Sequence, residues 1–120
     1  MATITVKLHF FPNDTSQNRP EYPDGQLIKP GDQVVFEQEG STLVHNVVMP
    51  QGNPFGISST TVATVGGLSA SSSPLTVASS FSRTHYPFTT TGNDKENDGT
   101  VEGEIEVPTE PDDEKKPGHP

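Results

Sequence analysis

Four histidines, and no cysteine, define the metal chemistry open to this chain. Imidazole nitrogen binds Cu(II) and Zn(II), whereas a blue-copper centre also needs a cysteine thiolate. His9 lies on the polar side of an alternating segment, and His119 lies in the last residues of the chain. Nothing in the spacing of the four indicates that they converge. His45 and His85 are the candidate metal ligands because both lie near the ends of predicted strands.

Acidic residues offer a second candidate metal site, in the loop 93–99. Oxygen-bearing side chains recur there at every second position and a glycine follows at the sixth place, as at the start of an EF-hand calcium loop. The twelfth place, however, is Ile105 instead of a bidentate carboxylate, and the flanking segments have strand patterns. The loop is therefore either a weak calcium site or a solvated turn rich in Asn and Asp.

Catalytic motifs are missing from the sequence. The serines are numerous, but none lies in a G-x-S-x-G elbow, and there is no glycine-rich loop of the kind that binds phosphate. We therefore expect a protein that is not an enzyme.

The elements that must position these residues are β-strands. Val, Ile and Thr far outnumber Ala and Leu, and β-branched residues favour strands over helices. Hydrophobic and polar residues alternate with a two-residue period, which is typical of half-buried strands. This pattern predicts strands at 3–10, 33–37, 43–49, 84–91 and 100–107.

The alternation also predicts which side chains form the core. Tyr86 and Phe88 should point inward, and the first and last strands should share one core. The core residues expected from those two strands are Ile4, Val6, Leu8, Val101 and Ile105. The opposite face of the last strand carries Glu102, Glu104 and Glu106, a solvent-facing row that discourages pairing with another sheet.

Charge is distributed unevenly over the 120 residues, whose net charge is −9. Residues 1–92 contain six acids and four bases, whereas residues 93–120 contain ten acids and three bases. We therefore expect no nucleic-acid partner. Separately, no apolar run is long enough to span a membrane. The expected domain is 1–107, followed by an acidic, proline-rich, disordered tail at 108–120. The start of the chain fits a cytoplasmic protein or a mature extracytoplasmic chain with an added methionine.

No Asp, Glu, Lys or Arg occurs between residues 40 and 82. One interpretation is a long low-complexity loop with edge strands near 75–77 and Phe81. The other is a neutral face that binds a protein partner or a second copy of the chain, with Pro50 and Phe55 as its contact residues.

Three segments resemble the cupredoxins, the family of plastocyanin, azurin and pseudoazurin. Residues 29–36 read KPGDQVVF, residues 45–48 read HNVV, and residues 101–107 read VEGEIEV. The resemblance covers residues 3–50 and 84–107, and it implies a Greek-key β-sandwich of about seven or eight strands. It also implies copper and electron transfer, with His45 as one ligand.

The remaining ligands of that family are replaced here. By resemblance, the cysteine position falls at about Thr90, the second histidine at about Asn93 and the methionine at Val101. The first hypothesis is therefore a copper-free cupredoxin-like protein that acts as a protein-binding or assembly module and has no cofactor. The alternative is a Cu(II)-binding protein that stores or delivers copper through His45 and His85. His45 has a further interpretation as a histidine that is hydrogen-bonded within the sandwich.

Overall fold

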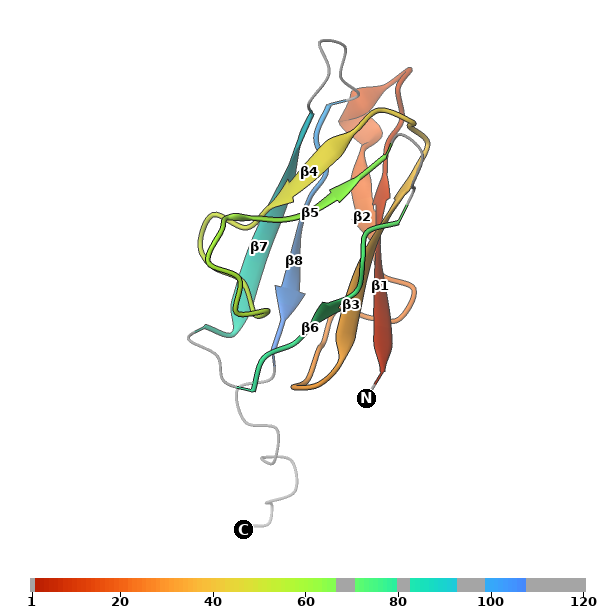
Figure 1. Cartoon of the computed structure of the whole chain (residues 1–120). Helices are drawn as coiled ribbons and strands as arrows, with labels where there is room; N and C mark the ends of the chain where they lie inside the picture. The colour runs from red at the N-terminus through yellow and green to blue at the C-terminus, as the bar shows by residue number, and fades with distance from the viewer. Residues whose placement is uncertain (1, 67–70, 80–82, 93–98, 108–120) are drawn as a thin grey trace.

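Two four-stranded β-sheets pack face to face in this chain (Figure 1). The structure is a computed structural model, and it describes residues 2–66, 71–79, 83–92 and 99–107. The first sheet has the order β2 (Arg19–Glu21), β1 (Thr3–His9), β3 (Gln33–Glu39), β6 (Leu75–Thr76). The second has the order β5 (Thr61–Val65), β4 (His45–Val48), β7 (His85–Gly92), β8 (Glu102–Glu106). The prediction of an all-β fold is confirmed.

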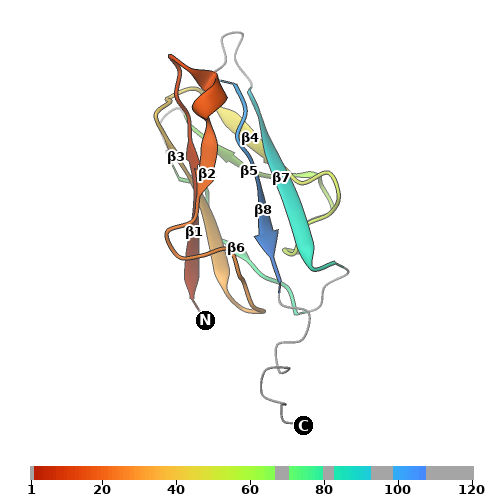
Figure 2. The same cartoon turned by 180° about the vertical axis from the view of Figure 1, so that it is seen from behind.

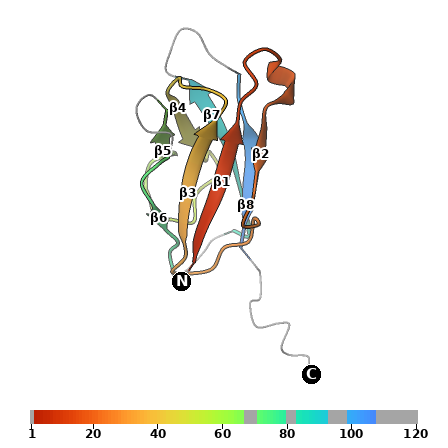
Figure 3. The ribbon, with the colours of Figure 1, turned by 90° about the vertical axis from the view of Figure 1, so that its right-hand side faces the viewer.

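Helical structure in the described residues is limited to one short 3-10 turn, Thr15–Gln17. None of their helices has the length and apolar character needed to cross a membrane. In Figure 3, β1 and β3 of the first sheet lie in front of β4 and β7 of the second.

The segment Lys29–Asp32 sets the register of the first sheet. Pro30 and Gly31 form a turn that the Asp32 N–H closes on the Lys29 carbonyl at 3.0 Å, and Gly31 has a φ of 90°, as a type II turn requires. The buried Asp32 carboxylate accepts the backbone N–H of Ala2 at 3.1 Å and of Lys29 at 3.0 Å. These bonds tie the start of β1 to the start of β3, which pair in parallel.

A single hydrophobic core fills the space between the sheets, and both sheets contribute to it. Every core residue expected from the first and last strands is buried in it, and so are Tyr86 and Phe88. The Phe36 and Phe88 rings meet edge to face with centroids 5.5 Å apart, so they join β3 to β7 across the sandwich. The predicted shared core is confirmed.

The outer edge of β8 is partly covered by residues 22–28. The Ile28 N–H donates to the Glu106 carbonyl, and the Glu106 N–H donates to the Gln26 carbonyl. The Tyr22 hydroxyl accepts the Glu104 N–H at 3.0 Å. A Cβ added at Gly103 would lie 2.6 Å from Phe88 Cζ and closer still to the Tyr22 hydroxyl, so only glycine fits there.

Two strands were not expected from the sequence, β2 and β5. β5 lies within the segment that we interpreted as a low-complexity loop, and it pairs with β4. The expected strand near 75–77 is present as β6, whereas Phe81 lies outside the described residues. The proposed calcium loop between residues 93 and 98 and the tail 108–120 also lie outside them.

Candidate functional site

His45 lies at the start of β4, with a side chain that is fully buried. Its ring stacks on Phe10 with centroids 4.2 Å apart, and its Nδ1 lies 2.8 Å from Gln38 Oε1. The amide of Gln38 donates to the carbonyls of Ser41 and Leu43, both at 2.8 Å. These contacts link β3 to β4 at one end of the sandwich.

The contacts of Gln38 also show which end of its amide faces the imidazole. The Nε2 atom of Gln38 must face the carbonyls of Ser41 and Leu43, because only the amide nitrogen of the side chain can donate. Its Oε1 therefore faces His45 and accepts a hydrogen from Nδ1. Nδ1 therefore carries a hydrogen and donates it to Gln38 inside the sandwich, so it is not free to bind a metal ion. This agrees with the interpretation of His45 as a hydrogen-bonded histidine.

His85 lies at the other end of the second sheet. In the β4–β7 pairing His45 is opposite Gly92, and Gly92 is seven residues along β7 from His85. A strand rises about 3.3 Å per residue, so the two histidines are roughly 23 Å apart along it. His45 also points into the core, whereas 59% of the His85 side chain is exposed. The structure does not bring the two predicted metal ligands together.

The neighbours of His85 are instead two glutamates of β8. β7 and β8 run side by side in Figure 2, and their register places His85 opposite Glu106 and Pro87 opposite Glu104. His85 Nδ1 lies 2.5 Å from Glu104 Oε2 and 3.9 Å from Glu106 Oε2. One imidazole nitrogen and two carboxylates therefore gather on the outer face of the second sheet.

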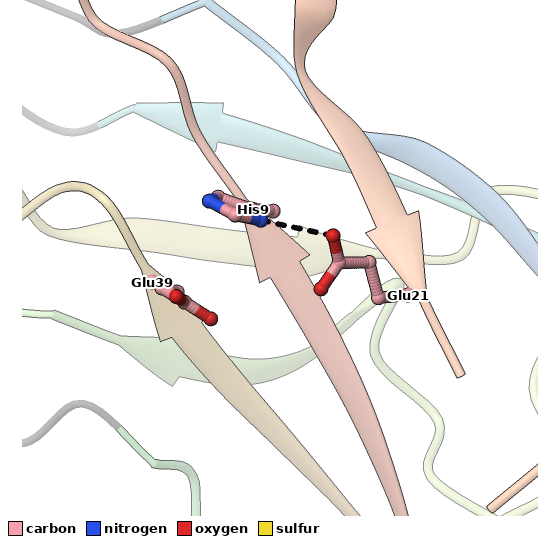
Figure 4. Close-up of side chains that lie close together, drawn as sticks. All are labelled: His9, Glu21 and Glu39. Atoms are coloured by element: carbon pink, nitrogen blue, oxygen red, sulfur yellow. Dashed lines mark hydrogen bonds and ion pairs between the residues drawn. The ribbon is translucent and has the colours of Figure 1, made fainter. Parts of the chain in front are cut away.

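A second group of the same composition lies on the outer face of the first sheet. Figure 4 shows His9 of β1 between Glu21 of β2 and Glu39 of β3, with its Nδ1 3.0 Å from Glu21 Oε2. Two cations already pair with these acids: Lys7 Nζ is 3.2 Å from Glu39 Oε1, and Arg19 Nε is 3.4 Å from Glu21 Oε2.

These contacts shift the pKa values of two groups, Glu21 and Lys7. The hydrogen bond from His9, with the nearby positive charges, holds the pKa of Glu21 below its usual value. The hydrogen bond that Lys7 donates to Glu39, and then the negative charge of Glu39, raise the pKa of Lys7. The cluster around His9 is thus neutralised by its own side chains.

Of the two residues predicted to contact a partner, Pro50 is exposed and Phe55 is half-buried. Phe55 packs against the core, and its N–H donates to Asn53 Oδ1 at 2.9 Å. His45 begins β4, whereas Pro50 follows the last residue of that strand. The two residues therefore lie at different ends of the sandwich. Pro50 does line a hollow of about 240 Å³, together with Pro87, Phe88, Thr89, Glu102 and Gly103.

The position that corresponds by resemblance to the copper cysteine is buried. Thr90 lies opposite Val47 in the β4–β7 pairing, and its hydroxyl oxygen accepts the backbone N–H of Val101 at 3.0 Å. The Thr90 side chain thus forms a hydrogen bond between β7 and the residue before β8, at the position where the family has its copper-binding cysteine.

The glutamates beside His85 were assigned by the sequence only to a solvent-facing row. The available signal was the alternation itself, since His85 and the glutamates lie on the outward positions of two neighbouring strands.

The sequence matches no family model and no curated protein.

Proposed function

We propose that this chain is a cupredoxin-like sandwich without a blue-copper centre, and that it acts as a non-catalytic protein-binding module. The resemblance to that family is supported by where the matching segments lie. Three positions that correspond by resemblance to copper ligands lie close together in the second sheet. His45 is in β4, Thr90 is in the adjacent β7, and Val101 directly precedes β8. Their side chains are all buried, and Thr90 and Val101 offer neither the thiolate nor the thioether sulfur of a blue-copper site.

The hollow beside Pro50 and Pro87 is the observation that carries the binding proposal. Small-molecule pockets usually measure about 300–1,000 Å³, so a hollow of about 240 Å³ is better suited to one protruding side chain of a partner. Its lining is largely apolar, and it lies on the outer face of the second sheet, beside the exposed carboxylate of Glu102.

The charge of this face selects the class of partner. Glu102, Glu104 and Glu106 follow one another along β8, and among the described residues no lysine or arginine forms an ion pair with any of them. A basic protein segment with one apolar side chain complements such a face. Two copies of this chain, each with a net charge of −9, would repel one another instead.

The test uses a displayed library of short peptides, selected against the full chain in a buffer that contains a chelator. We expect the enriched peptides to have basic residues next to an aliphatic or aromatic residue, and to bind less tightly as salt increases. Chemical shift changes on binding should centre on the residues around Pro50, Thr89 and Glu102.

Charge reversal at the hollow supplies the matched comparison. Glu102→Lys should weaken binding of the enriched peptides by about tenfold or more, whereas Glu37→Lys, the same change on the other sheet, should have little effect. Enriched peptides without basic residues, equal effects of the two substitutions, or no enrichment would contradict the proposal. Sedimentation of the free protein should show a monomer, and a dimer that Glu102→Lys disrupts would show that self-association is the function of this face.

A further inference from the structure

The outer face of β7 and β8 holds a group of metal-ligand side chains outside the region of His45. One ligand atom from each of His85, Glu104 and Glu106 can be chosen so that all three lie within 4.8 Å of one another. Ligands bound about 2.1 Å from one ion can be at most about 4.2 Å apart, so small side-chain rotations suffice. The three residues project from two paired strands, which hold their backbone positions fixed.

Charge distinguishes this group from the one around His9. Lys7 and Arg19 pair with the glutamates beside His9, so a metal ion there would have to compete with two cations already in place. Among the described residues, the ion pairs of Glu104 and Glu106 are formed with His85 alone. A neutral imidazole leaves two adjacent negative charges without a counter-charge, and a divalent cation would neutralise both.

We propose that His85, Glu104 and Glu106 form a binding site for a divalent transition-metal ion, Cu²⁺ or Zn²⁺. His85 supplies Nδ1, each glutamate supplies a carboxylate oxygen, and water completes the coordination because the site lies at the surface. The nitrogen ligand favours these ions over Ca²⁺ and Mg²⁺, which prefer oxygen. The site lies at the opposite end of β7 from His45, and it requires neither a thiolate nor the partner proposed above.

The experiment is a titration of the full chain with Cu²⁺, and in parallel with Zn²⁺, in a non-coordinating buffer. The chain carries His119→Gln throughout, so that the imidazole near the C-terminus does not contribute. We expect one equivalent of ion to bind, with the ring resonances of His85 broadened by Cu²⁺ and shifted by Zn²⁺ before those of His9. The electron paramagnetic resonance spectrum of the Cu²⁺ form should show coupling to a single imidazole nitrogen.

Substitutions at the exposed His85 and the two half-buried glutamates assign the ligands. His85→Gln, Glu104→Gln and Glu106→Gln should each weaken binding by at least about tenfold. Loss of a residue that only hydrogen-bonds a metal ligand already lowers affinity by about that factor, and loss of a ligand should cost no less. His9→Gln is the matched control and should leave affinity unchanged. Amide spectra of the variants should show an intact fold. Binding that all three substitutions leave unchanged, binding centred on His9, or no binding of either ion would overturn the proposal. Partner binding is measured with a chelator present, so its failure and that of the metal site are separate results.

Discussion

Gln38 and His45 show how a buried polar pair can be structural in this sandwich. Both side chains are buried, and Gln38 bonds to His45 Nδ1 and to two backbone carbonyls. A metal-binding histidine needs an accessible nitrogen and further ligands around it. The opposite case is His85, which is exposed and has two carboxylates as neighbours.

Gln38→Ala should therefore destabilise the protein by about 2–3 kcal/mol, because a buried donor and two acceptors each lose a partner. Gln33→Ala is the matched control: it removes a half-buried glutamine from the same strand, and should change the free energy of unfolding by less than about 1 kcal/mol. Urea unfolding followed by circular dichroism measures both. Equal effects of the two substitutions would show that the Gln38 network contributes no stability of its own.

Glu21 should make part of the stability depend on pH. Its pKa in the folded protein is lowered from the ordinary value of 4.5, first by the hydrogen bond from His9. A lowered carboxyl pKa contributes stability that is complete above the ordinary value and is lost as the pH falls through the folded-state pKa. Glu21→Gln should lower stability at neutral pH and reduce the loss on acidification. Asp14, whose pKa is lowered by hydrogen bonds from Ser16 and Gln17, should retain its own share of acid sensitivity.

Unfolding midpoints measured between neutral pH and about pH 3 check this expectation. Glu102→Gln is the control, since this glutamate is exposed. If Glu21→Gln and Glu102→Gln changed the pH profile equally, the hydrogen bond between His9 and Glu21 would not be the source of the effect.

β8 is held by contacts outside its own sheet as well as by its pairing with β7. Tyr22 and residues 26–28 bond its outer edge, and Gly103 allows Tyr22 and Phe88 to approach its backbone. The row of glutamates then covers the face that remains exposed. β8 is thus held by both a neighbouring strand and a segment that leaves the first sheet.

Gly103→Ala should destabilise the sandwich by about 1–3 kcal/mol, because the added methyl group would overlap Tyr22 and Phe88. Gly25→Ala is a useful comparison: no atom lies within 4 Å of its added Cβ, and the strain arises from its φ of 87° alone. Tyr22→Phe removes the hydroxyl nearest the new methyl group, but it also removes the acceptor of the Glu104 N–H, so it should cost less stability in the Gly103→Ala background than in the unaltered protein. Thermal unfolding of the three variants decides this, and a neutral Gly103→Ala would mean that β8 can shift outward.

The sequence predicted the longer strands whose side chains alternate and the short edge strand β6, and it missed β2 and β5. β1, β3, β7 and β8 bury every second residue, apart from Gly92 and Gly103. β5 buries Val62 and Val65, three residues apart, and its pairing with β4 is interrupted at Val47 and Val48. β2 has three residues, one of them proline. Periodicity cannot detect an irregular strand or a strand of three residues.

The candidate site was predictable only in part, for a related reason. The sequence places His85 and the glutamates on outward positions, but the pairing of His85 with Glu106 depends on the register of β7 and β8. His45 was identified as a ligand candidate by resemblance, whereas its burial against Phe10 and Gln38 depends on contacts between distant segments.

At the scale of the whole molecule, the lack of any cysteine limits the optical properties of every metal form. A blue-copper site owes its colour to a thiolate ligand, and a site of imidazole and carboxylate groups cannot produce that intense band. Adding Cu²⁺ should therefore give at most a weak visible absorption. An absorption spectrum of the copper-loaded chain tests this directly, and an intense blue colour would refute the argument that such a band needs a thiolate ligand.

Charge at long range should affect association differently from charge at the contact face. Residues 108–120 contain four acids and two bases, so removing them changes the net charge from −9 to −7. Interactions between exposed charges are screened beyond about 8 Å at physiological ionic strength. Deleting 108–120 should therefore slow association with a basic peptide at low salt and have little effect at physiological salt. Glu102→Lys changes a charge at the hollow itself, and should weaken binding at both salt concentrations. Stopped-flow association rates and equilibrium affinities at two ionic strengths separate the cases. If the deletion abolished binding and Glu102→Lys did not, the acidic C-terminal segment would be the contact element instead of the hollow.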